Sequence, residues 1–224
     1  MSNMGMTQPQ QPDTRHPALP AILHVEGLCF AYPERTLFAD WSASISPGVS
    51  LVRGGDGRGK TTLLRLLAGA LPADAGRLQI QGIGLLDQAP AYRQQLFWVD
   101  PRTDAFDQMT PLEYLEAQRG FYPGFDEQML KALIEGLALA PQMDKQLYML
   151  STGSKRKVWL AAAFASGAAL TLLDMPFAAL DKASIGFVLG LLQEAADHPA
   201  RAWMVADYEA PREVRLSGLM DLGD

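Results

Sequence analysis

The sequence predicts an α/β layer fold in one large domain that carries a helical insertion. Three observations predict it: short apolar strands alternate with helices, the 224 residues are 48% hydrophobic and 20% charged, and the alternation gives way to helical periodicity after Val99. A chain of this length and composition can bury a sizeable core. We expect a disordered tail at 1–20 and one domain at 21–224, with the helical subdomain inserted at about 101–165.

Period-two patterns, turn residues and short apolar runs predict the strands of the first half. The expected strands are 21–32, 37–46, 49–52, 76–86 and 96–99. Pro47-Gly48 turns the chain after the second strand, and Asp100-Pro101 ends the fifth. An apolar helix, "LLRLLAGAL", follows the third strand after a glycine-rich loop.

The second half is predicted to be mostly helical. Helices are expected within 110–149, where Thr110-Pro111 with Glu113 forms a capping box, and at 151–165 and 182–196. Strands are expected just before Asp174 and at 202–205, whereas 214–223 is too short to assign.

Charge, cysteine content and hydropathy narrow the class of protein. A net charge of -6 argues against a protein that coats nucleic acid, so we expect no nucleic-acid partner. The single cysteine, Cys29, excludes an internal disulfide and fits a reducing cytosol. No signal peptide is visible, and the apolar run at 158–173 is shorter than the roughly 18 residues of a membrane span. We therefore expect a membrane connection only through a partner.

The stretch "GGDGRGKT" predicts a phosphate cradle. It fits G-x-x-x-x-G-K-[ST] and lies between a buried strand and a helix, the context that this pattern requires. Glycines let backbone N–H groups wrap around phosphate oxygens, Lys60 can reach the β- and γ-phosphates, and the Thr61 hydroxyl can bind Mg²⁺. The purely structural alternative is a glycine-rich strand–helix turn. The predicted ATP-binding residues here are Gly54, Gly55, Asp56, Gly57, Arg58, Gly59, Lys60, Thr61 and Thr62.

A carboxylate at the tip of a neighbouring buried strand predicts the second magnesium ligand. "LTLLDMPFAALD" places Asp174 after an apolar run, and Pro176 prevents the strand from continuing. A nucleotide-bound Mg²⁺ needs such a carboxylate, directly or through water. The predicted metal site is therefore Thr61 with Asp174.

Two further segments resemble those of ATP-binding cassette (ABC) ATPases. "LSTGS" is similar to the family's signature LSGGQ, and its Ser151 lies 23 residues before Asp174. "DMPFAALD" resembles the family's Walker B motif and D-loop, with Asp181 as the D-loop acid. Tyr32 stands where the family has an aromatic that stacks on adenine. An alternative interpretation of "LSTGS" is an ordinary helix cap, with Ser151 as the N-cap. We also expect the run Lys155-Arg156-Lys157 to be a solvated helix face.

The resemblance covers about 21–216 and implies a fold and an assembly. The fold is that of a P-loop NTPase of ABC type: a mixed sheet core, an antiparallel β subdomain and an inserted helical subdomain. The assembly is a homo- or heterodimer of ABC ATPase subunits, docked on integral membrane transporter subunits at the inner, cytoplasmic face of the cell membrane. Each ATP would lie between one cradle and the other subunit's signature residues, here Ser151, Thr152, Gly153 and Ser154. "ERTLF", "LLRLLAG" and "YRQQLFWV" look most like the haem-export, cytochrome-c-maturation ATPase.

Three positions depart from the family pattern. Met175 replaces the Glu that polarises the attacking water, and Asp207 stands where the family has a His that contacts the γ-phosphate. Asp100 or Pro101 replaces a Gln near the metal, and Asp100 could still bind Mg²⁺ through water. Loss of a positioned base costs roughly 10²- to 10⁴-fold in rate. We therefore expect ATP binding with very slow hydrolysis in this chain's own site.

Three functions remain open from the sequence. The first is an ABC transporter subunit that pairs with a more competent ATPase. The second is an active homodimeric ATPase that uses another residue or substrate-assisted chemistry. The third is a regulatory or assembly module whose ATP-closed dimer is the signal.

Overall fold

The computed structural model describes residues 20–223. The predicted tail lies outside the described residues apart from Pro20, and the predicted domain boundaries stay a prediction. Within 20–223, no helix has both the length and the apolar content needed to cross a membrane.

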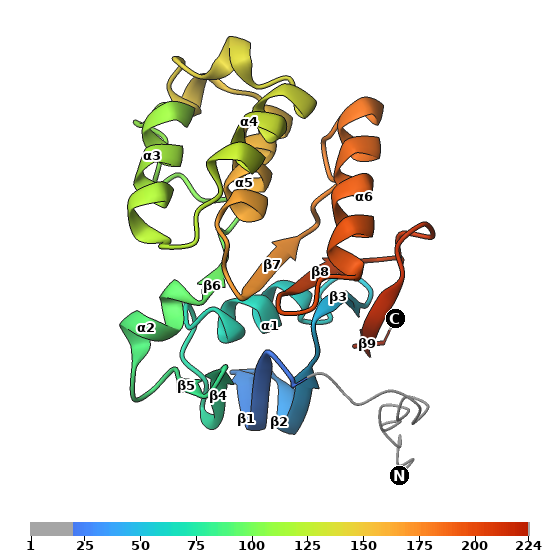
Figure 1. Cartoon of the computed structure of the whole chain (residues 1–224). Helices are drawn as coiled ribbons and strands as arrows, with labels where there is room; N and C mark the ends of the chain where they lie inside the picture. The colour runs from blue at the N-terminus through green and yellow to red at the C-terminus, as the bar shows by residue number, and fades with distance from the viewer. Residues whose placement is uncertain (1–19, 224) are drawn as a thin grey trace.

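An antiparallel sheet of order β2-β1-β4-β5 forms the layer at the base of the view in Figure 1. Its strands are β1 (Leu23–Tyr32), β2 (Arg35–Ile45), β4 (Ala75–Ile80) and β5 (Ile83–Gly84). In β1, Leu23 and Val25 are buried, and a bulge at Gly27 then shifts the alternation so that Leu28 and Phe30 are buried next. The predicted strands 21–32 and 37–46 are confirmed, whereas 76–86 divides into two strands.

A parallel sheet of order β6-β7-β8-β3-β9 forms the second layer. Its strands are β3 (Gly48–Arg53), β6 (Leu96–Phe97), β7 (Leu170–Asp174), β8 (Ala202–Asp207) and β9 (Leu216–Asp221). The segment that the sequence left unassigned supplies β9, which pairs with β3. The predicted strand at 96–99 is shorter than expected, because only Leu96 and Phe97 pair with β7.

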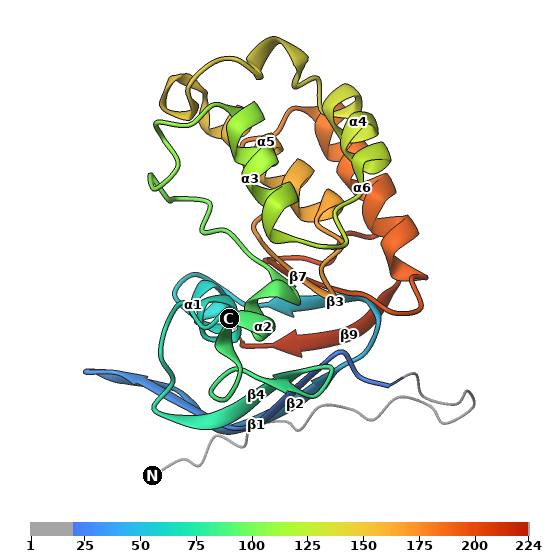
Figure 2. The ribbon, with the colours of Figure 1, turned by 60° about the vertical axis from the view of Figure 1, so that its left-hand side comes forward.

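Two apolar cores hold these layers together. Helix α1 (Lys60–Leu67) lies between the two sheets, where its buried leucines pack against both (Figure 2). It ends earlier than the sequence predicted, because Gly69 adopts φ +63°. The opposite face of the parallel sheet packs against α6 (Lys182–Ala196) and the helices that precede β7.

The stretch between β6 and β7 is helical, as its periodicity predicted. It contains α3 (Pro111–Phe121), α4 (Glu127–Gly136) and α5 (Thr152–Ala165), with short 3-10 turns at Ala140–Gln142 and Leu147–Met149. A short helix, α2 (Ala89–Gln94), precedes β6. The capping box at the start of α3 is confirmed: the Thr110 hydroxyl accepts from the Glu113 N–H, and the Glu113 carboxylate accepts from the Thr110 N–H.

A tight turn at Gly167 connects α5 to β7 and so sets where β7 begins. Gly167 has φ +69°, and a Cβ there would lie 2.0 Å from the carbonyl oxygen of Gly124. The apolar run at 158–173 is therefore a helix, a turn and a strand, as predicted.

Gly167→Ala is expected to lower the free energy of unfolding by at least about 2 kcal/mol, since a left-handed backbone costs roughly 1–2 kcal/mol and overpacking adds to it. Urea unfolding followed by circular dichroism measures the change. Gly190→Ala in α6 is the control, because its Cβ would meet nothing within 4 Å. This control should be neutral or stabilising by up to about 1 kcal/mol. Equal losses in both variants would contradict the assigned turn.

Candidate functional site

The glycine-rich loop runs from the end of β3 into the first turn of α1. Gly57 has φ +69° and Gly59 has φ +103°, a backbone region that side chains with a Cβ rarely adopt. Gly59 is the N-cap of α1 and provides no side-chain hydrogen bond. The first N–H groups of α1 are therefore free of a side-chain cap, and a helix N-terminus of this kind favours an anion.

Lys60 turns back over this loop. Its ammonium is buried and donates to the carbonyl oxygens of Gly54 and Gly55, the latter at 3.0 Å. It also lies 4.3 Å from the centre of the Tyr208 ring. The lysine is thus held inside the loop, in the position from which it can reach phosphate oxygens.

A cavity of about 390 Å³ opens above the loop. The loop and the start of α1, from Gly55 to Thr62, line one side of it. The other lining side chains that matter here are Tyr32, Arg35, Arg102, Asp174, Met175 and Tyr208. The cavity brings together the predicted phosphate, metal and adenine residues, which lie far apart in the sequence.

Thr61 and Asp174 meet in this cavity. The Thr61 hydroxyl donates to one carboxylate oxygen of Asp174 at 2.7 Å. The other carboxylate oxygen, Oδ1, is buried and has no hydrogen-bond partner within residues 20–223. Burial raises the pKa of Asp174, and the Thr61 hydrogen bond partly opposes this. An unpaired, desolvated carboxylate oxygen beside a hydroxyl fits a hard divalent cation, so this pair could hold Mg²⁺.

The residue after Asp174 has no acid–base group. Met175 lines the cavity, has φ +48°, and donates its N–H to the Ala206 carbonyl at 2.9 Å. Met175 is thereby fixed between the tips of β7 and β8. A thioether at this place cannot accept a proton from water.

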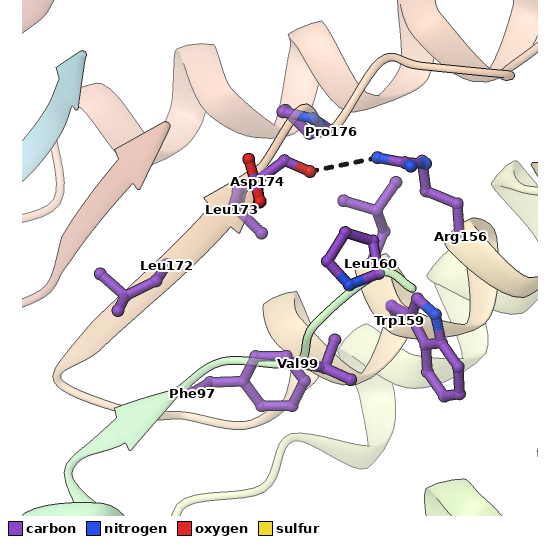
Figure 3. A pocket seen from close by; sticks show the side chains of 10 residues that line it. Phe97, Val99, Arg156, Trp159, Leu160, Leu172, Leu173, Asp174 and Pro176 are labelled. Carbon is purple, nitrogen blue, oxygen red and sulfur yellow. Dashed lines mark hydrogen bonds between the residues drawn. The ribbon is translucent and has the colours of Figure 1, made fainter. Parts of the chain in front are cut away.

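Arg156 supports the tip of β7 from α5. Its guanidinium donates to the main-chain carbonyl of Asp174 at 3.1 Å (Figure 3). It also donates to the main-chain carbonyl of Met175. Burial lowers the pKa of Arg156, while the charges of Asp174 and Asp207 oppose that shift. An apolar pocket that includes Phe97, Val99 and Pro101 lies beside this contact.

The expectation that Lys155-Arg156-Lys157 forms a solvated face is wrong. All three side chains are only partly exposed and have partners. Lys155 pairs with Asp107, Lys157 pairs with Asp181, and Arg156 binds the carbonyls described above. The run joins the start of α5 to three neighbouring segments, which periodicity alone does not reveal.

The signature segment (Ser151–Ser154) forms the start of α5, with Ser151 and Thr152 exposed and Gly153 and Ser154 partly buried. Ser151 is the N-cap and accepts from the Ser154 N–H at 3.1 Å, as the capping interpretation expects. A Cβ at Gly153 would lie 2.2 Å from the Ala179 carbonyl, so only glycine fits against the segment after β7. In the part of the chain that the structure describes, these residues do not line the cavity above the loop.

Asp181 caps α6. Its carboxylate accepts from the Ser184 N–H at 2.9 Å and from Lys157 at 2.7 Å. The Lys157 hydrogen bond is the largest cause that lowers the pKa of Asp181. This contact holds the D-loop against α5.

Tyr32 and the residues after β6 flank the cavity. Tyr32 is 43% exposed, and its hydroxyl lies 3.2 Å from that of Thr62. Asp100 accepts from the Arg102 N–H at 3.0 Å, and Pro101 lines the apolar pocket. Arg102, and neither Asp100 nor Pro101, is among the residues that line the cavity. The predicted adenine contact of Tyr32 and the predicted water-mediated metal contact of Asp100 stay predictions.

Asp207 ends β8 close to Lys60. Burial raises the pKa of this carboxyl, and hydrogen bonding to the Tyr208 N–H and the Lys60 charge partly oppose the rise. Its carboxylate accepts from the Tyr208 N–H at 2.7 Å.

Sequence reasoning missed four residues around this site: Arg35, Arg102, Arg156 and Tyr208. Arg35 donates to the Gly57 carbonyl at 2.9 Å and so braces the loop from β2. The Tyr208 hydroxyl donates to Asp56. Arg35 lies in "ERTLF" and Arg156 in the basic run of α5, but neither segment carried a prediction of a site residue, and only "DYEAP" after the predicted strand 202–205 offered a signal for Tyr208.

Comparisons with known proteins agree with this geometry. The family described as ABC transporter matches residues 39–178. The cytochrome c biogenesis ATP-binding export protein CcmA of Salmonella typhi is 36% identical over 185 residues, which cover 82% of this chain and 87% of that protein. The protein of the same name from Escherichia coli K12 is 37% identical over 187 residues, covering 82% and 86%.

A solved structure described as the ATP binding subunit of an ABC transporter shares the fold. Its TM-score is 0.73 at 23% identity, and the match covers 83% of this chain and 79% of that one. With the glycine-rich loop, the paired sheets and the sequence matches in agreement, this chain belongs to the ABC transporter family as an ATP-binding domain with the family's P-loop NTPase fold.

Proposed function

We propose that this chain is the ATP-binding subunit of an ABC transporter complex that binds Mg-ATP at a dimer interface and hydrolyses it only weakly in its own site. Family membership implies binding of ATP with Mg²⁺, dimerisation, and pairing with membrane subunits at the membrane surface. One observation carries the proposal: Lys60 and the Thr61–Asp174 pair line the same cavity as Met175, which replaces the catalytic base.

The phosphate and metal groups support the binding half of the proposal. Lys60 would exchange its loop carbonyls for phosphate oxygens, while the uncapped start of α1 favours the same negative charge. Thr61 and the unpaired oxygen of Asp174 would hold Mg²⁺, which supplies charge neutralisation between the β- and γ-phosphates. Tyr32 would stack on the base.

The groups near the terminal phosphate support the weak-hydrolysis half. Met175 has no proton acceptor, and Asp207 is a carboxylate that would repel a phosphate at short range. The charge of Asp174 contributes to raising the pKa of Asp207, and Arg156 lies close enough to both carboxylates for their charges to act on its own pKa. The site therefore has groups that would bind ATP, but with Met175 after the metal carboxylate it has no positioned base.

The position of the signature segment supports a dimer. Its first two residues, Ser151 and Thr152, are exposed, it starts a helix, and it lies outside the chain's own cavity as the structure describes it. Such a helix start can bind the γ-phosphate of an ATP held by a second subunit. We propose that this second subunit is a more competent ATPase, and that this chain completes its site.

The Salmonella and Escherichia relatives are named for cytochrome c biogenesis and export. For this chain we propose the ATP-binding role and assign no transported substrate.

The purified chain is expected to bind Mg-ATP and to turn it over very slowly. Met175→Glu with Asp207→His should raise the turnover at least about tenfold, because a positioned base contributes roughly 10²- to 10⁴-fold. Steady-state phosphate release measures the rate. The control is Met175→Gln with Asp207→His, which has a side chain of similar length and no base. Fast turnover by the unmodified chain would instead support an active homodimer.

Asp174→Asn is expected to stabilise the metal-free chain at pH 7. Burial raises the pKa of Asp174, so the folded state disfavours its charge, and this loss of stability grows as the pH rises from the unfolded pKa through the folded one. The difference between variant and parent should vanish below about pH 4, where both states hold the proton. Urea unfolding at several pH values measures it.

At pH 7, saturating Mg-ATP should make the parent chain more stable than Asp174→Asn. The parent chain gains stability from the bound ligand, whereas the variant lacks the metal carboxylate and gains less. If Asp174→Asn remained the more stable of the two in Mg-ATP, the assignment of Asp174 to the metal would be contradicted.

In the complex purified through this chain from detergent-solubilised membranes, Thr152→Glu is expected to lower ATP turnover at least about tenfold. The carboxylate suits the start of α5, so folding is preserved, but it repels a γ-phosphate presented by the second subunit. Thr152→Ser keeps the hydroxyl and is the control. Purification without any membrane subunit would favour the regulatory or assembly module over the transporter.

A further inference from the structure

Tyr208 lines the cavity beside Lys60. It is the residue after β8, and its side chain is 45% exposed. Its hydroxyl donates to a carboxylate oxygen of Asp56, in the glycine-rich loop. The face of its ring lies over the Lys60 ammonium, with the nitrogen 4.3 Å from the ring centre. One side chain therefore spans from the end of β8 to the loop.

The contact with Lys60 fixes what Tyr208 can reach. The ammonium is the group that would bind the β- and γ-phosphates, so a ring in contact with it lies beside the place of the terminal phosphate. A phosphate that approaches Lys60 must displace the ring or accept a hydrogen bond from its hydroxyl. A partly exposed side chain with one end free of the core can make that movement at low cost.

Tyr208 supplies a proton donor where its neighbours supply negative charge. Asp56 and Asp207 are its neighbours, and an ionised carboxylate accepts hydrogen bonds but donates none. The hydrogen bond to Asp56 is the largest cause that raises the pKa of Tyr208, so the phenol keeps its proton at neutral pH. A neutral hydroxyl can donate to a phosphate oxygen without adding repulsion.

We propose that Tyr208 joins Lys60 in contacting the terminal phosphate and that its hydroxyl distinguishes nucleoside triphosphates from diphosphates. The hydroxyl exchanges its hydrogen bond to Asp56 for one to a γ-phosphate oxygen. The ring moves away from the Lys60 ammonium, which then binds the phosphates. Asp56 is exposed, so water replaces the lost hydrogen bond. The inference rests on the proposed binding of Mg-ATP and adds the residue that sets its phosphate specificity.

The test compares ATP and ADP binding to full-length Tyr208→Phe and to the parent chain by calorimetry in Mg²⁺. Phenylalanine keeps the ring over Lys60 and removes only the hydroxyl. The ATP dissociation constant should rise roughly tenfold, the effect of losing a hydrogen bond to a charged group, while that of ADP stays unchanged. Tyr148→Phe is the control for the chemical change, because Tyr148 is 54% exposed and does not line the cavity.

Three outcomes would overturn the inference. An unchanged ratio of ATP to ADP affinity would show that the hydroxyl does not contact the terminal phosphate. An equal gain in affinity for both nucleotides would show that Tyr208 only covers the loop. A parent chain that binds neither nucleotide would refute the proposed function itself, which separates that failure from a failure of Tyr208 alone. Matching thermal unfolding of the variants and the parent confirms that folding is unaffected.

Discussion

The hydrogen bond between Thr61 and Asp174 is the contact on which the arrangement of the site depends. It joins the first turn of α1 to the tip of β7, although 113 residues separate the two side chains. The strand order makes the contact possible, because β8 alone separates β7 from β3 in the parallel sheet. All three strands end at the same edge, where ligands of parallel sheets bind. The loop after β3, Asp174 after β7, and Asp207 with Tyr208 at the end of β8 therefore converge.

This convergence concentrates charge in a partly buried space. Burial raises the pKa of both Asp174 and Asp207, so each carboxylate is costly without a cation. Lys60, Arg102 and Arg156 supply positive charge from three different segments. The balance explains how the fold tolerates an unpaired carboxylate oxygen: the surrounding cations offset part of its desolvation, and a divalent ion would offset the rest.

The motifs and the main elements could be predicted because their signals are local. The phosphate loop combines glycines, Lys60 and Thr61 in consecutive positions, and the capping box of α3 needs only residues three apart. The residues that were missed act across long separations. Arg156 had the appearance of a surface charge because its acceptors are main-chain carbonyls, which carry no sequence pattern. Tyr208 and Asp56 are 152 positions apart and meet only because β3 and β8 are neighbours.

The register of β1 and the length of β6 escaped prediction for a related reason. The bulge at Gly27 reverses which side chains face the core, and its effect shows only once β2 is paired with β1. Val99 has strand-like character but leaves the sheet, because β7 pairs with only Leu96 and Phe97. Pairing with a partner strand, and not the propensity of the segment, decides where an edge strand ends.

The first turns of α5 connect the surface proposed to face a second subunit with the proposed metal site. Gly153 packs closely against the Ala179 carbonyl, Lys157 pairs with Asp181, and Arg156 binds the carbonyls of Asp174 and Met175. These contacts span the backbone from the metal carboxylate to the cap of α6. A γ-phosphate that engaged Ser151 and Thr152 would thus act on a helix already bonded to the tip of β7. The absence of a base at Met175 does not weaken these contacts, because Arg156 binds that residue through its main chain. In the proposed dimer, the contacts that would link the two sites therefore do not depend on the side chain of residue 175.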